Sequence, residues 1–388
     1  MIHATPRRQV SLLVETSNRY GREVVTGVFD FARQRNDWVV HVPEHGRSQF
    51  ANVWQYAAKC DGVIARVESK SVARRVRSLN RPLVNMCSLG FVPEFVSVVA
   101  DCEAIGRLAA QHLLERGFTN FGFLGLAEIS WSEQREASFK KMTLAAGFEC
   151  RSFFLQSRAM EEWDRERDAL KTWLQSLPRP TAIMAATDAV GQYLLQLCRE
   201  FGRQIPTDVA VIGVNNDELY CELGEPQMSS IILNGRQAGY EAAALLHALM
   251  DGNVIPPTFC KIPPVGVATR QSTDFAAVTD EQVAVAVGYI RQHACDGISV
   301  EDVVAVTRLS RSTLERRFRK ALNCTLRDQI QQERIKQVQT LLRETNLPLK
   351  EIAYHSGFEY PEYLTAVFKR VIGLSPSEYR KRIARRRS

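Results

Sequence analysis

The polar residues between 361 and 371 have the types and spacing of side chains that contact the edges of DNA bases. Leu364, Phe368 and Val371 recur at i, i+4 and i+7, which predicts a helix with one apolar face that begins at Pro361. The side chains left on the opposite face are Glu362, Thr365, Ala366, Lys369 and Arg370. These donors and acceptors could be presented to the major groove of DNA.

A shorter helix must precede that face and position it. Leu349, Ile352 and Ala353 give this helix an apolar face of its own, and Gly357 ends it. Residues 349–372 therefore have the pattern of a helix-turn-helix. Helical hairpins are common, so this one pattern is suggestive only.

A second copy of the same layout lies upstream. Val303 and Val304 begin it, and LERRFRK at 314–320 aligns with LTAVFKR at 364–370. Between the copies, residues 325–344 contain neither Gly nor Pro and place their apolar residues mostly on one stripe. The sequence therefore predicts an all-α domain in which a long helix connects two helix-turn-helix units.

Basic residues are concentrated in the same part of the chain. Residues 283–388 contain 20 Lys and Arg against 11 Asp and Glu, a net charge of +9, whereas the preceding 282 residues contain 30 against 32. A solvated surface explains any single cluster, but this localisation is typical of phosphate neutralisation in DNA binding. The tail RKRIARRRS is weaker evidence, because exposed basic tails are often disordered.

Residues 283–383 resemble the C-terminal DNA-binding domain of the AraC family of transcription regulators. The closing segment GFEYPEYLTAVFKRVIGLSPSEYR is the most specific part of the likeness. The resemblance implies binding to double-stranded DNA with paired half-sites, and RNA polymerase as a partner. From the second helix, Glu362, Thr365 and Lys369 are the candidate DNA contacts.

Two departures from the family pattern shift the expected base contacts to the first recognition helix. Ala366 stands where many relatives carry an Arg that faces DNA, and Arg308 occupies a turn position that is usually Gly. The exposed candidates on the first helix are Arg311, Ser312, Glu315, Arg316 and Arg319. The arginines at 311 and 316 could contact guanine edges or phosphates, and the glutamate could accept from cytosine. Arg317 and Arg319 could equally be plain surface charges.

Before residue 283, strand and helix signals alternate. Apolar segments such as residues 9–16, 181–187 and 209–216 predict buried strands, and residues 21–35 and 188–202 predict helices. This alternation predicts a parallel α/β fold built twice. A dehydrogenase would show the same alternation, but no G-x-G-x-x-G opens a helix after the first strand and no G-x-x-x-x-G-K-[ST] occurs.

The order of local motifs in residues 9–270 resembles the ligand-binding domain of LacI/GalR-type repressors. The segments that carry it include QVSLLVETSNRYGREVVTGV, VVADCEAIGRLAAQHLLERG, SEQREASF, AIMAATDAVGQYLLQ and VAVIGVNND. The resemblance implies a two-lobed type I periplasmic-binding-protein fold, with a small polar ligand between two α/β lobes joined by three crossovers. It also implies a homodimer, to which the helix GRQAGYEAAALLHALMDG would contribute a surface. The N-terminal DNA headpiece of LacI is absent, and the AraC-type domain supplies that role.

The combination of these two parts resembles the bacterial regulators of xylose operons, including the local segments RQSTDF, YIRQHACDGI and LSRSTLERRF. It implies D-xylose or a related monosaccharide as the effector, and activation of xylose catabolism genes. Matching the LacI/GalR pocket pattern carries over eight candidate ligand-binding residues: Asn18, Asp101, Arg135, Trp163, Thr187, Asp188, Asn215 and Asp217.

In that pocket, Asp101 and Arg135 could grip vicinal hydroxyls as acceptor and donor, and Trp163 could stack on the sugar ring. The structural alternative is that Asp101 and Asp188 cap helices and that Arg135 pairs with a neighbouring Glu. The family often has Asp where Asn215 stands and Gln where Leu233 stands. This pocket has therefore lost acceptors, for which Asn216, Asp217 or Asn234 could compensate.

Length and composition set the remaining expectations. The domain plan is a tail at 1–8, the sensor at 9–270, a linker at 271–282, the DNA-binding domain at 283–383 and a basic tail at 384–388. The first apolar run is too short for a signal peptide, and no segment has the roughly 18 apolar residues of a membrane span. Nine scattered cysteines form no C-x-x-C, as is typical of reduced thiols in a cytoplasmic protein without contact to a membrane.

The leading hypothesis is a sugar-responsive, dimeric transcription activator that needs no cofactor and no metal. A repressor, or a regulator that responds to another pentose or a hexose, is the first alternative. A sugar-acting enzyme fused to a DNA-binding domain is the second, although neither H-E-x-x-H nor G-x-S-x-G occurs. A periplasmic transport receptor is disfavoured by the missing signal peptide and by the DNA-binding half.

Overall fold

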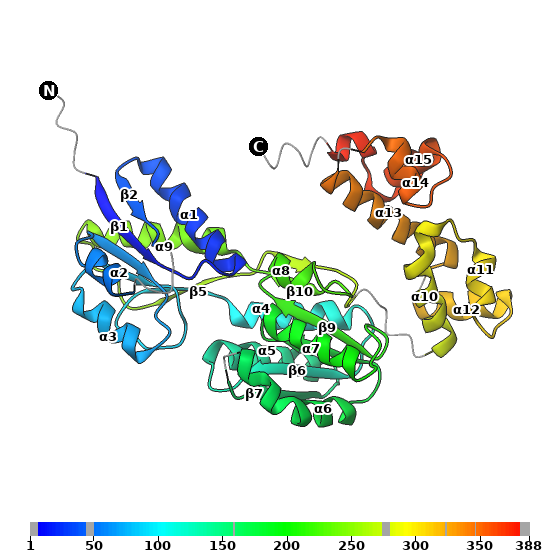
Figure 1. Ribbon diagram of the computed structural model, residues 1–388, viewed down its shortest axis with the longest axis horizontal. Helices are drawn as coiled ribbons and strands as arrows, with labels where there is room; N and C mark the ends of the chain where they lie inside the picture. The colour runs from blue at the N-terminus through cyan, green and yellow to red at the C-terminus, as the bar shows by residue number, and fades with distance from the viewer. Residues whose placement is uncertain are drawn as a thin grey trace. The chain divides into compact units, whose positions relative to one another are not determined.

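The computed structural model of the protein describes residues 7–43, 50–157, 160–273, 280–322, 324–345 and 347–380. The chain forms two compact units, Met1–Asp274 and Phe275–Ser388 (Figure 1). Most of the N-terminal tail predicted at 1–8, the basic tail predicted at 384–388, and part of the linker predicted at 271–282 lie outside the described residues.

The first lobe of the first unit is built on a parallel sheet with the strand order β11-β5-β4-β3-β1-β2. Its strands are β1 (Arg8–Leu13), β2 (Trp38–His41), β3 (Gly62–Ala65), β4 (Leu83–Asn85), β5 (Ser97–Ala100) and β11 (Phe259–Ile262). Its helices are α1 (Arg19–Arg35), α2 (Phe50–Ala57), α3 (Lys70–Ser78) and α9 (Gly235–Met250). Successive side chains of a strand point to opposite faces, so Ile64 packs with α1 and α9, while Val63 and Ala65 pack with α2 and α3.

The second lobe has a second sheet, with the strand order β12-β10-β9-β8-β6-β7, in which β12 alone pairs antiparallel among the described strands. Its strands are β6 (Phe121–Leu126), β7 (Cys150–Leu155), β8 (Thr181–Ala185), β9 (Val209–Val214), β10 (Ser229–Ile232) and β12 (Gly266–Ala268). Its helices are α4 (Cys102–Leu114), α5 (Ser130–Ala145), α6 (Arg167–Ser176), α7 (Asp188–Glu200) and the short α8 (Glu218–Cys221). The chain crosses between the lobes after β5, β10 and β11.

The central strands explain why the sequence pattern predicts this architecture. Both β8 and β9 are buried along their whole length, and their sequences TAIMA and VAVIGV are continuous apolar runs. Parallel strands covered by helices on both faces show such runs rather than an alternation of polar and apolar residues. The prediction of two parallel α/β lobes is confirmed.

Two glycines let α1 and α9 approach each other closely. A Cβ atom at Gly27 would lie 1.9 Å from the Arg236 carbonyl oxygen, and one at Gly239 would lie 2.0 Å from the Val24 carbonyl oxygen. Any side chain at either position would force the helix backbones apart. The close packing on α9 fixes the position of α1, whose first residues border the space between the lobes.

A change from 3-10 to α geometry divides one helical segment of the second lobe. Residues 163–177 look like one amphipathic helix in the sequence, but they form the end of a 3-10 helix, η1 (Met160–Glu166), followed by α6. Trp163 lies in η1 with only 2% of its surface exposed, inside the core cluster of the lobe. The Trp163 ring is buried where the 3-10 helix precedes α6, so the indole does not lie at the surface of the lobe.

The second unit is all α, as predicted. It contains α10 (Glu281–His293), η2 (Ala294–Asp296), α11 (Val300–Ala305), α12 (Arg311–Leu322), α13 (Leu326–Glu344), α14 (Leu349–His355) and α15 (Pro361–Ile372). One hydrophobic cluster joins α10 to α12 and the start of α13, and another joins the rest of α13 to α14 and α15. Each cluster contains one of the two predicted helix-turn-helix units.

Helix α13 connects the two clusters. It begins with a capping box between Thr325 and Asp328, and it buries Ile330 in the first cluster and Val338 in the second. Near its middle, Arg334 donates from Nε to the Ala294 carbonyl oxygen at 2.8 Å and from Nη2 to Ile298 O at 2.9 Å. A single continuous helix therefore carries both helix-turn-helix units.

The buried face of α15 differs in one residue from the prediction. Val371 is 47% exposed, and Val367 is buried beside Leu364 and Phe368. Positions i, i+3 and i+4 form the buried stripe, and i+7 falls at its edge in the last turn of the helix. Glu362, Lys369 and the other predicted outward residues remain on the opposite face.

Candidate ligand pocket and nucleic-acid interface

A cavity of about 180 Å³ lies between the two lobes of the first unit. Residues that follow the carboxyl ends of strands in both sheets form its wall, which is where parallel α/β sheets bind ligands. The lining residues are Asn18, Tyr20, Arg66, Met86, Cys87, Ser88, Val99, Ala100, Cys102, Trp131, Arg135, Thr187, Asn215 and Leu233. The volume is below the roughly 300–1,000 Å³ of pockets for drug-sized ligands, so the cavity suits a small molecule.

Arg135 gives the pocket its most informative group. Its side chain is 5% exposed, and Nη1 donates to the Ala186 carbonyl oxygen at 2.5 Å. Cζ lies 4.9 Å from the ring centroid of Trp131, one turn earlier on α5. Among the described residues Nε is buried without a hydrogen-bond partner. Arg135 also lines the cavity, so a guanidinium group that can donate hydrogen bonds lies in this wall.

Asn18 and Thr187 combine a structural task with a place in the pocket wall. The Asn18 side-chain oxygen accepts from the Gly21 amide at 2.9 Å and caps α1, and the Thr187 hydroxyl accepts from the Val190 amide at 3.3 Å and caps α7. Each cap uses a side-chain oxygen as acceptor, which leaves the Asn18 amide group and the Thr187 O–H as donors. The two caps therefore fix two polar groups on opposite lobes.

The wall at the end of β9 is a strained turn. Asn215 has φ 117° and Asn216 has φ 52°, both in the region that non-glycine residues rarely adopt. The Asn215 amide donates to Ile231 O at 3.1 Å, and Asn215 itself lines the pocket. Each such residue costs roughly 1–3 kcal/mol and persists where the surroundings enforce it, typically at functional sites.

Four of the eight predicted ligand residues do not line the cavity. Asp101 lies between the lining residues Ala100 and Cys102, and its carboxylate caps α4 by accepting from the Ala104 amide at 3.0 Å. Trp163 lies in the lobe core, where Nε1 donates to Ser157 O at 2.9 Å. The other two, Asp188 and Asp217, belong to a polar network beside the pocket.

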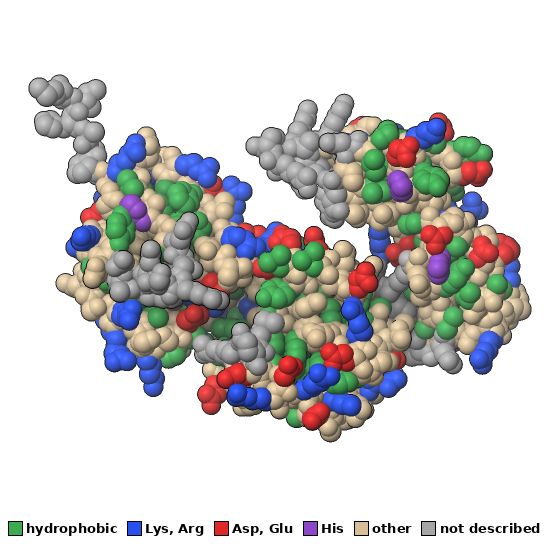
Figure 2. All heavy atoms as spheres, in the orientation of Figure 1, with side chains coloured by type: hydrophobic (Ala, Val, Ile, Leu, Met, Phe, Trp, Pro, Cys, Tyr) green, Lys and Arg blue, Asp and Glu red, His purple; other side chains and the backbone are tan. Residues whose placement is uncertain are grey.

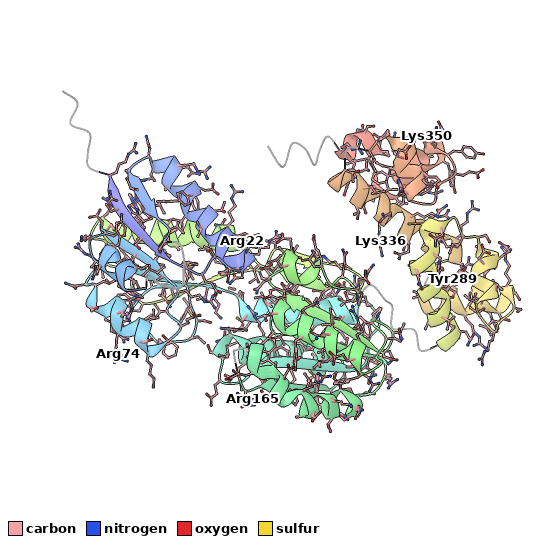
Figure 3. All side chains as sticks on the ribbon, viewed as in Figure 1. Arg22, Arg74, Arg165, Tyr289, Lys336 and Lys350 are labelled. Atoms are coloured by element: carbon pink, nitrogen blue, oxygen red, sulfur yellow. The ribbon has the colours of Figure 1, made fainter. Side chains whose placement is uncertain are left out.

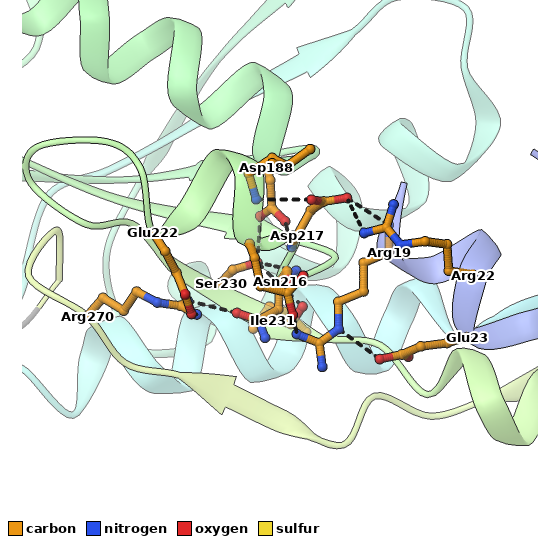
Figure 4. A network of polar contacts seen from close by, with 12 residues as sticks. Arg19, Arg22, Glu23, Asp188, Asn216, Asp217, Glu222, Ser230, Ile231 and Arg270 are labelled. Carbon is orange, nitrogen blue, oxygen red and sulfur yellow. Dashed lines mark hydrogen bonds and ion pairs between the residues drawn. The ribbon is translucent and has the colours of Figure 1, made fainter. Parts of the chain in front are cut away.

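In this network Asp188 is almost fully buried, at 1% exposure. It accepts from the Ser230 hydroxyl at 2.5 Å and from the Asp217 amide at 2.8 Å (Figure 4). Burial raises the pKa of Asp188 to about 6, against the opposing effect of these hydrogen bonds. Thr187, rather than Asp188, is the cap of α7.

Asp217 and its neighbours join the two lobes. The Asp217 carboxylate accepts from the Arg19 backbone amide at 2.7 Å, and Arg22 Nη2 lies 3.8 Å from it (Figure 4). Figure 3 shows the position of Arg22 on α1. Arg19 Nη1 also forms an ion pair with Glu218 at 2.5 Å and donates to Asn216 O at 3.1 Å. Arg19 and Arg22 belong to α1 of the first lobe, so these contacts hold the second lobe against it.

Several lining residues were missed by sequence reasoning. Trp131 supplies the aromatic face for which Trp163 was expected, and its position four residues before Arg135 on one helix was a signal for it. Arg66 directly follows strand β3, and Tyr20 lies in the first turn of α1, the helix after β1. Burial raises the pKa of Tyr20 to about 12, so its hydroxyl stays protonated as a donor.

The second unit has a concave surface at its first helix-turn-helix. The groove has a volume of about 810 Å³. All five predicted contacts of the first recognition helix α12 line it, together with the basic residues Lys320 and Arg327. The full lining consists of Val300, Arg311, Ser312, Glu315, Arg316, Arg319, Lys320, Thr325, Leu326 and Arg327. Arg311 is held there by ion pairs with Glu301 and, at 3.0 Å, with Glu315. The groove thus carries more cationic than anionic side chains.

The second recognition helix α15 presents a less basic face. Glu362, Ala366 and Lys369 are exposed, whereas the hydroxyl of the half-buried Thr365 donates to Pro361 O at 2.8 Å within the helix. Arg370 donates to Gln331 of α13 at 2.9 Å. The two recognition helices therefore offer different chemistry to a nucleic acid.

The turn before α12 does not have the left-handed geometry that a Gly position in the family pattern implies. Arg308 is not among the non-glycine residues with positive φ in the described part of the chain, and its amide donates to the Gln282 side chain at 2.7 Å. The turn therefore accommodates Arg without left-handed geometry.

Charges on the first unit are mixed in sign. On the face shown in Figure 2, Asp and Glu side chains alternate with Lys and Arg over the lobe that contains α6 and α7. Across the described ranges, no three His, Cys, Asp or Glu side chains group as metal ligands would. None of the described helices has the length and apolarity required to cross a lipid bilayer.

Comparison with known proteins finds relatives of the whole chain. Residues 110–273 match the periplasmic binding protein-like domain, and residues 303–382 match a helix-turn-helix domain. The xylose operon regulatory protein of Escherichia coli K12 is 33% identical over 384 residues, which cover 97% of each chain, and that of Haemophilus influenzae is 31% identical over 96% of this chain and 98% of its own. The solved structure of the xylose-binding transcription activator XylR is 32% identical, with a TM-score of 0.78 over 97% of this chain and 98% of that chain.

Proposed function

The chain belongs to the family of xylose operon regulatory proteins, and on that premise we propose that it is a D-xylose-responsive transcription activator. The resemblance to a LacI/GalR-type sensor joined to an AraC-type domain is confirmed by both domain matches. The relatives are transcription regulators, which argues against the enzyme alternative. The observation that carries the proposal is the Arg135 guanidinium, which lies beside the Trp131 ring in the lining of a small interlobe cavity.

In the proposed complex, the sugar ring lies against Trp131 and its hydroxyls bond to the polar wall. Arg135 donates to one or two hydroxyls, and Asn18, Thr187 and Asn215 add donors and acceptors from three different elements. Asp101 does not line the cavity, so its proposed role is to fix the start of α4 and the lining residue Cys102 beside the sugar. The remaining predicted residues act indirectly: Asp188 and Asp217 hold the lobes, and Trp163 supports the second lobe.

Leu233 supports a pentose rather than a hexose as the effector. An apolar side chain in the wall leaves the exocyclic hydroxyl of a hexose without a partner, which costs about 1–3 kcal/mol when it is buried. The C5 methylene of a pentopyranose has no hydrogen bond to lose. We therefore expect D-xylose to bind more tightly than D-glucose.

The DNA-binding half acts through two recognition helices of unequal chemistry. We propose that Arg311, Ser312, Glu315, Arg316 and Arg319 of α12 make most base and phosphate contacts, and that Glu362, Thr365 and Lys369 of α15 make fewer. A cytoplasmic homodimer would place two such units on paired half-sites and contact RNA polymerase from that position. Sedimentation of the purified protein with and without a two-half-site duplex tests the dimer.

Calorimetric titration of the purified protein with D-xylose, L-arabinose, D-ribose and D-glucose tests the effector. Selective binding of D-xylose, together with tighter operator binding in its presence, is the expected result. Binding of another sugar alone would overturn the effector assignment, and operator binding that weakens with sugar would make the protein a repressor. An absence of binding to all four sugars would contradict the proposed function.

A further inference from the structure

Asn216 lies next to the pocket and bonds in three directions. Its backbone N–H donates to the Ser230 hydroxyl at 2.9 Å, and its backbone carbonyl oxygen accepts from Arg19 Nη1 of the first lobe at 3.1 Å. Its side-chain oxygen accepts from Arg270 Nη1 at 2.7 Å. The residue is 6% exposed and follows the pocket residue Asn215 directly, so any movement of that turn reaches all three partners (Figure 4).

Arg270 connects this turn to the end of the first unit. Its Nη1 also donates to Met228 O at 3.1 Å, and its Nη2 forms an ion pair with Glu222 at 3.0 Å. The side chain is mostly buried, and its guanidinium is shared among three partners. Arg270 therefore cannot follow Asn216 without moving its own backbone or breaking one of these bonds.

The residues after Arg270 are held in the sheet of the second lobe. The Ser272 amide donates to Gln227 O at 3.0 Å, its hydroxyl donates to Val211 O at 2.6 Å, and the Thr273 hydroxyl donates to Ser229 Oγ at 2.7 Å. Residue 273 is the last described position before the chain continues to the DNA-binding unit. The segment 270–273 is thus firmly bonded at the end of the sensor, and the Arg270 side chain connects it to Asn216, the residue next to the pocket residue Asn215.

We propose that the Asn216–Arg270 contact transmits occupancy of the pocket to the exit segment 270–273 and so to the DNA-binding unit. This inference rests on the proposed function, and it makes both residues positioning residues of the response rather than sugar contacts. Sugar binding rearranges Asn215 and draws Arg19 with the first lobe, and both changes act on Asn216. The strained turn at 215–216 is suited to this because it stores energy that a small displacement can release.

The test uses variants of the full-length protein that break the contact and preserve the turn. Asn216→Gly removes the acceptor and still permits positive φ, and Arg270→Lys keeps the charge beside Glu222 but loses the fork. Arg151→Ala is the matched control, because this arginine of the same lobe donates to Ser176 O at 2.9 Å on the surface. Sugar affinity is measured by calorimetry, and operator affinity by fluorescence anisotropy with and without D-xylose.

The expected wild-type response is a change in operator affinity of roughly 5- to 150-fold on addition of sugar. In Asn216→Gly and in Arg270→Lys, the ratio of operator affinities with and without sugar moves toward one, while sugar still binds in the absence of DNA. The double variant reduces that ratio no further than either single variant does. Because coupling is reciprocal, operator DNA also ceases to alter sugar affinity in these variants. A ratio that stays at the wild-type value in both single variants sinks the proposal.

Amide hydrogen exchange separates this proposal from the proposed function. Asn216→Gly must speed exchange at residues 270–273 relative to wild type and to Arg151→Ala, whether or not any sugar binds. Unchanged exchange there overturns the transmission path by itself. Faster exchange in a protein that binds none of the four sugars would retain the path and reject the effector assignment.

Discussion

Replacement of Arg135 by Ala should weaken D-xylose binding strongly while leaving the protein folded. Nη1 is held by Ala186 O and the side chain lines the cavity, so we expect the remaining N–H groups of the guanidinium to donate to the sugar. A hydrogen bond to a charged group contributes about 1.5–3 kcal/mol. Loss of one such bond corresponds to a roughly 10- to 150-fold rise in Kd, and loss of the ordered face of Trp131 adds to it.

Two further variants show whether geometry or charge is responsible. Arg135→Lys keeps a cation but cannot donate to Ala186 O and a sugar hydroxyl from one planar group, so its affinity should lie between those of wild type and Arg135→Ala. Arg151→Ala removes an exposed arginine from β7 of the same lobe and should bind sugar as wild type does.

Calorimetry at one salt concentration gives the Kd values, and thermal melting without sugar checks folding. The Ala variant leaves Ala186 O without its donor, which costs about 1–3 kcal/mol of stability, so a modestly lower Tm is expected. Tight xylose binding by a folded Arg135→Ala variant would show that the guanidinium does not contact the sugar. The assignment of the pocket would then have to be abandoned.

Three other perturbations follow from the structure. The pKa of Asp188 is raised to about 6 from 3.8, so the native state holds its proton more tightly than the unfolded state. The free energy of unfolding should fall by about 2 kcal/mol as pH rises from 4 to 6, and urea unfolding of Asp188→Asn should lack that part of the pH dependence. Gly239→Ala would place a Cβ 2.0 Å from Val24 O and should cost about 1–3 kcal/mol or more by urea unfolding, whereas Gly266→Ala, with no atom within 4 Å of its Cβ, should be neutral. Arg316→Ala should weaken operator binding and reduce the slope of log K against log salt by about one, while Arg317→Ala, whose arginine pairs with Asp280 at 3.1 Å, should change it less in the same anisotropy titration.

The parts of the fold that could be predicted are those in which apolar residues recur with the period of a helix or form the continuous run of a buried strand. The continuous apolar runs of β8 and β9 and the repeated spacing in α12 and α15 arise from burial, which is a property of the sequence itself. Asn18, Arg135, Thr187 and Asn215 were predicted from family positions, and the structure brings all four to one cavity. Whether they contact a sugar remains a prediction.

The orientation of single side chains was not predictable in the same way. Trp163 lies close to a helix start, but a 3-10 turn rotates its ring into the core, and sequence spacing does not distinguish that turn from an α-helix. Asp188 follows the cap residue Thr187 by one position, and that single step moves its carboxylate from the cavity wall to Ser230. The contacts of Asp217 with α1 join residues about 200 positions apart, which local patterns do not encode.

Because α13 is one continuous helix, its length fixes the spacing and the relative rotation of the two recognition helices. A helix of 19 residues is about 28 Å long, and inserting one residue would advance everything after it by about 1.5 Å and rotate it by about 100°. The hydrogen bonds of Arg334 to Ala294 O and Ile298 O fix the orientation of α13 relative to the first helix-turn-helix. A change in the length of α13 would rotate α15 away from the face on which we propose that α12 contacts DNA, so relatives of this chain should conserve the length of α13 more strictly than that of any loop.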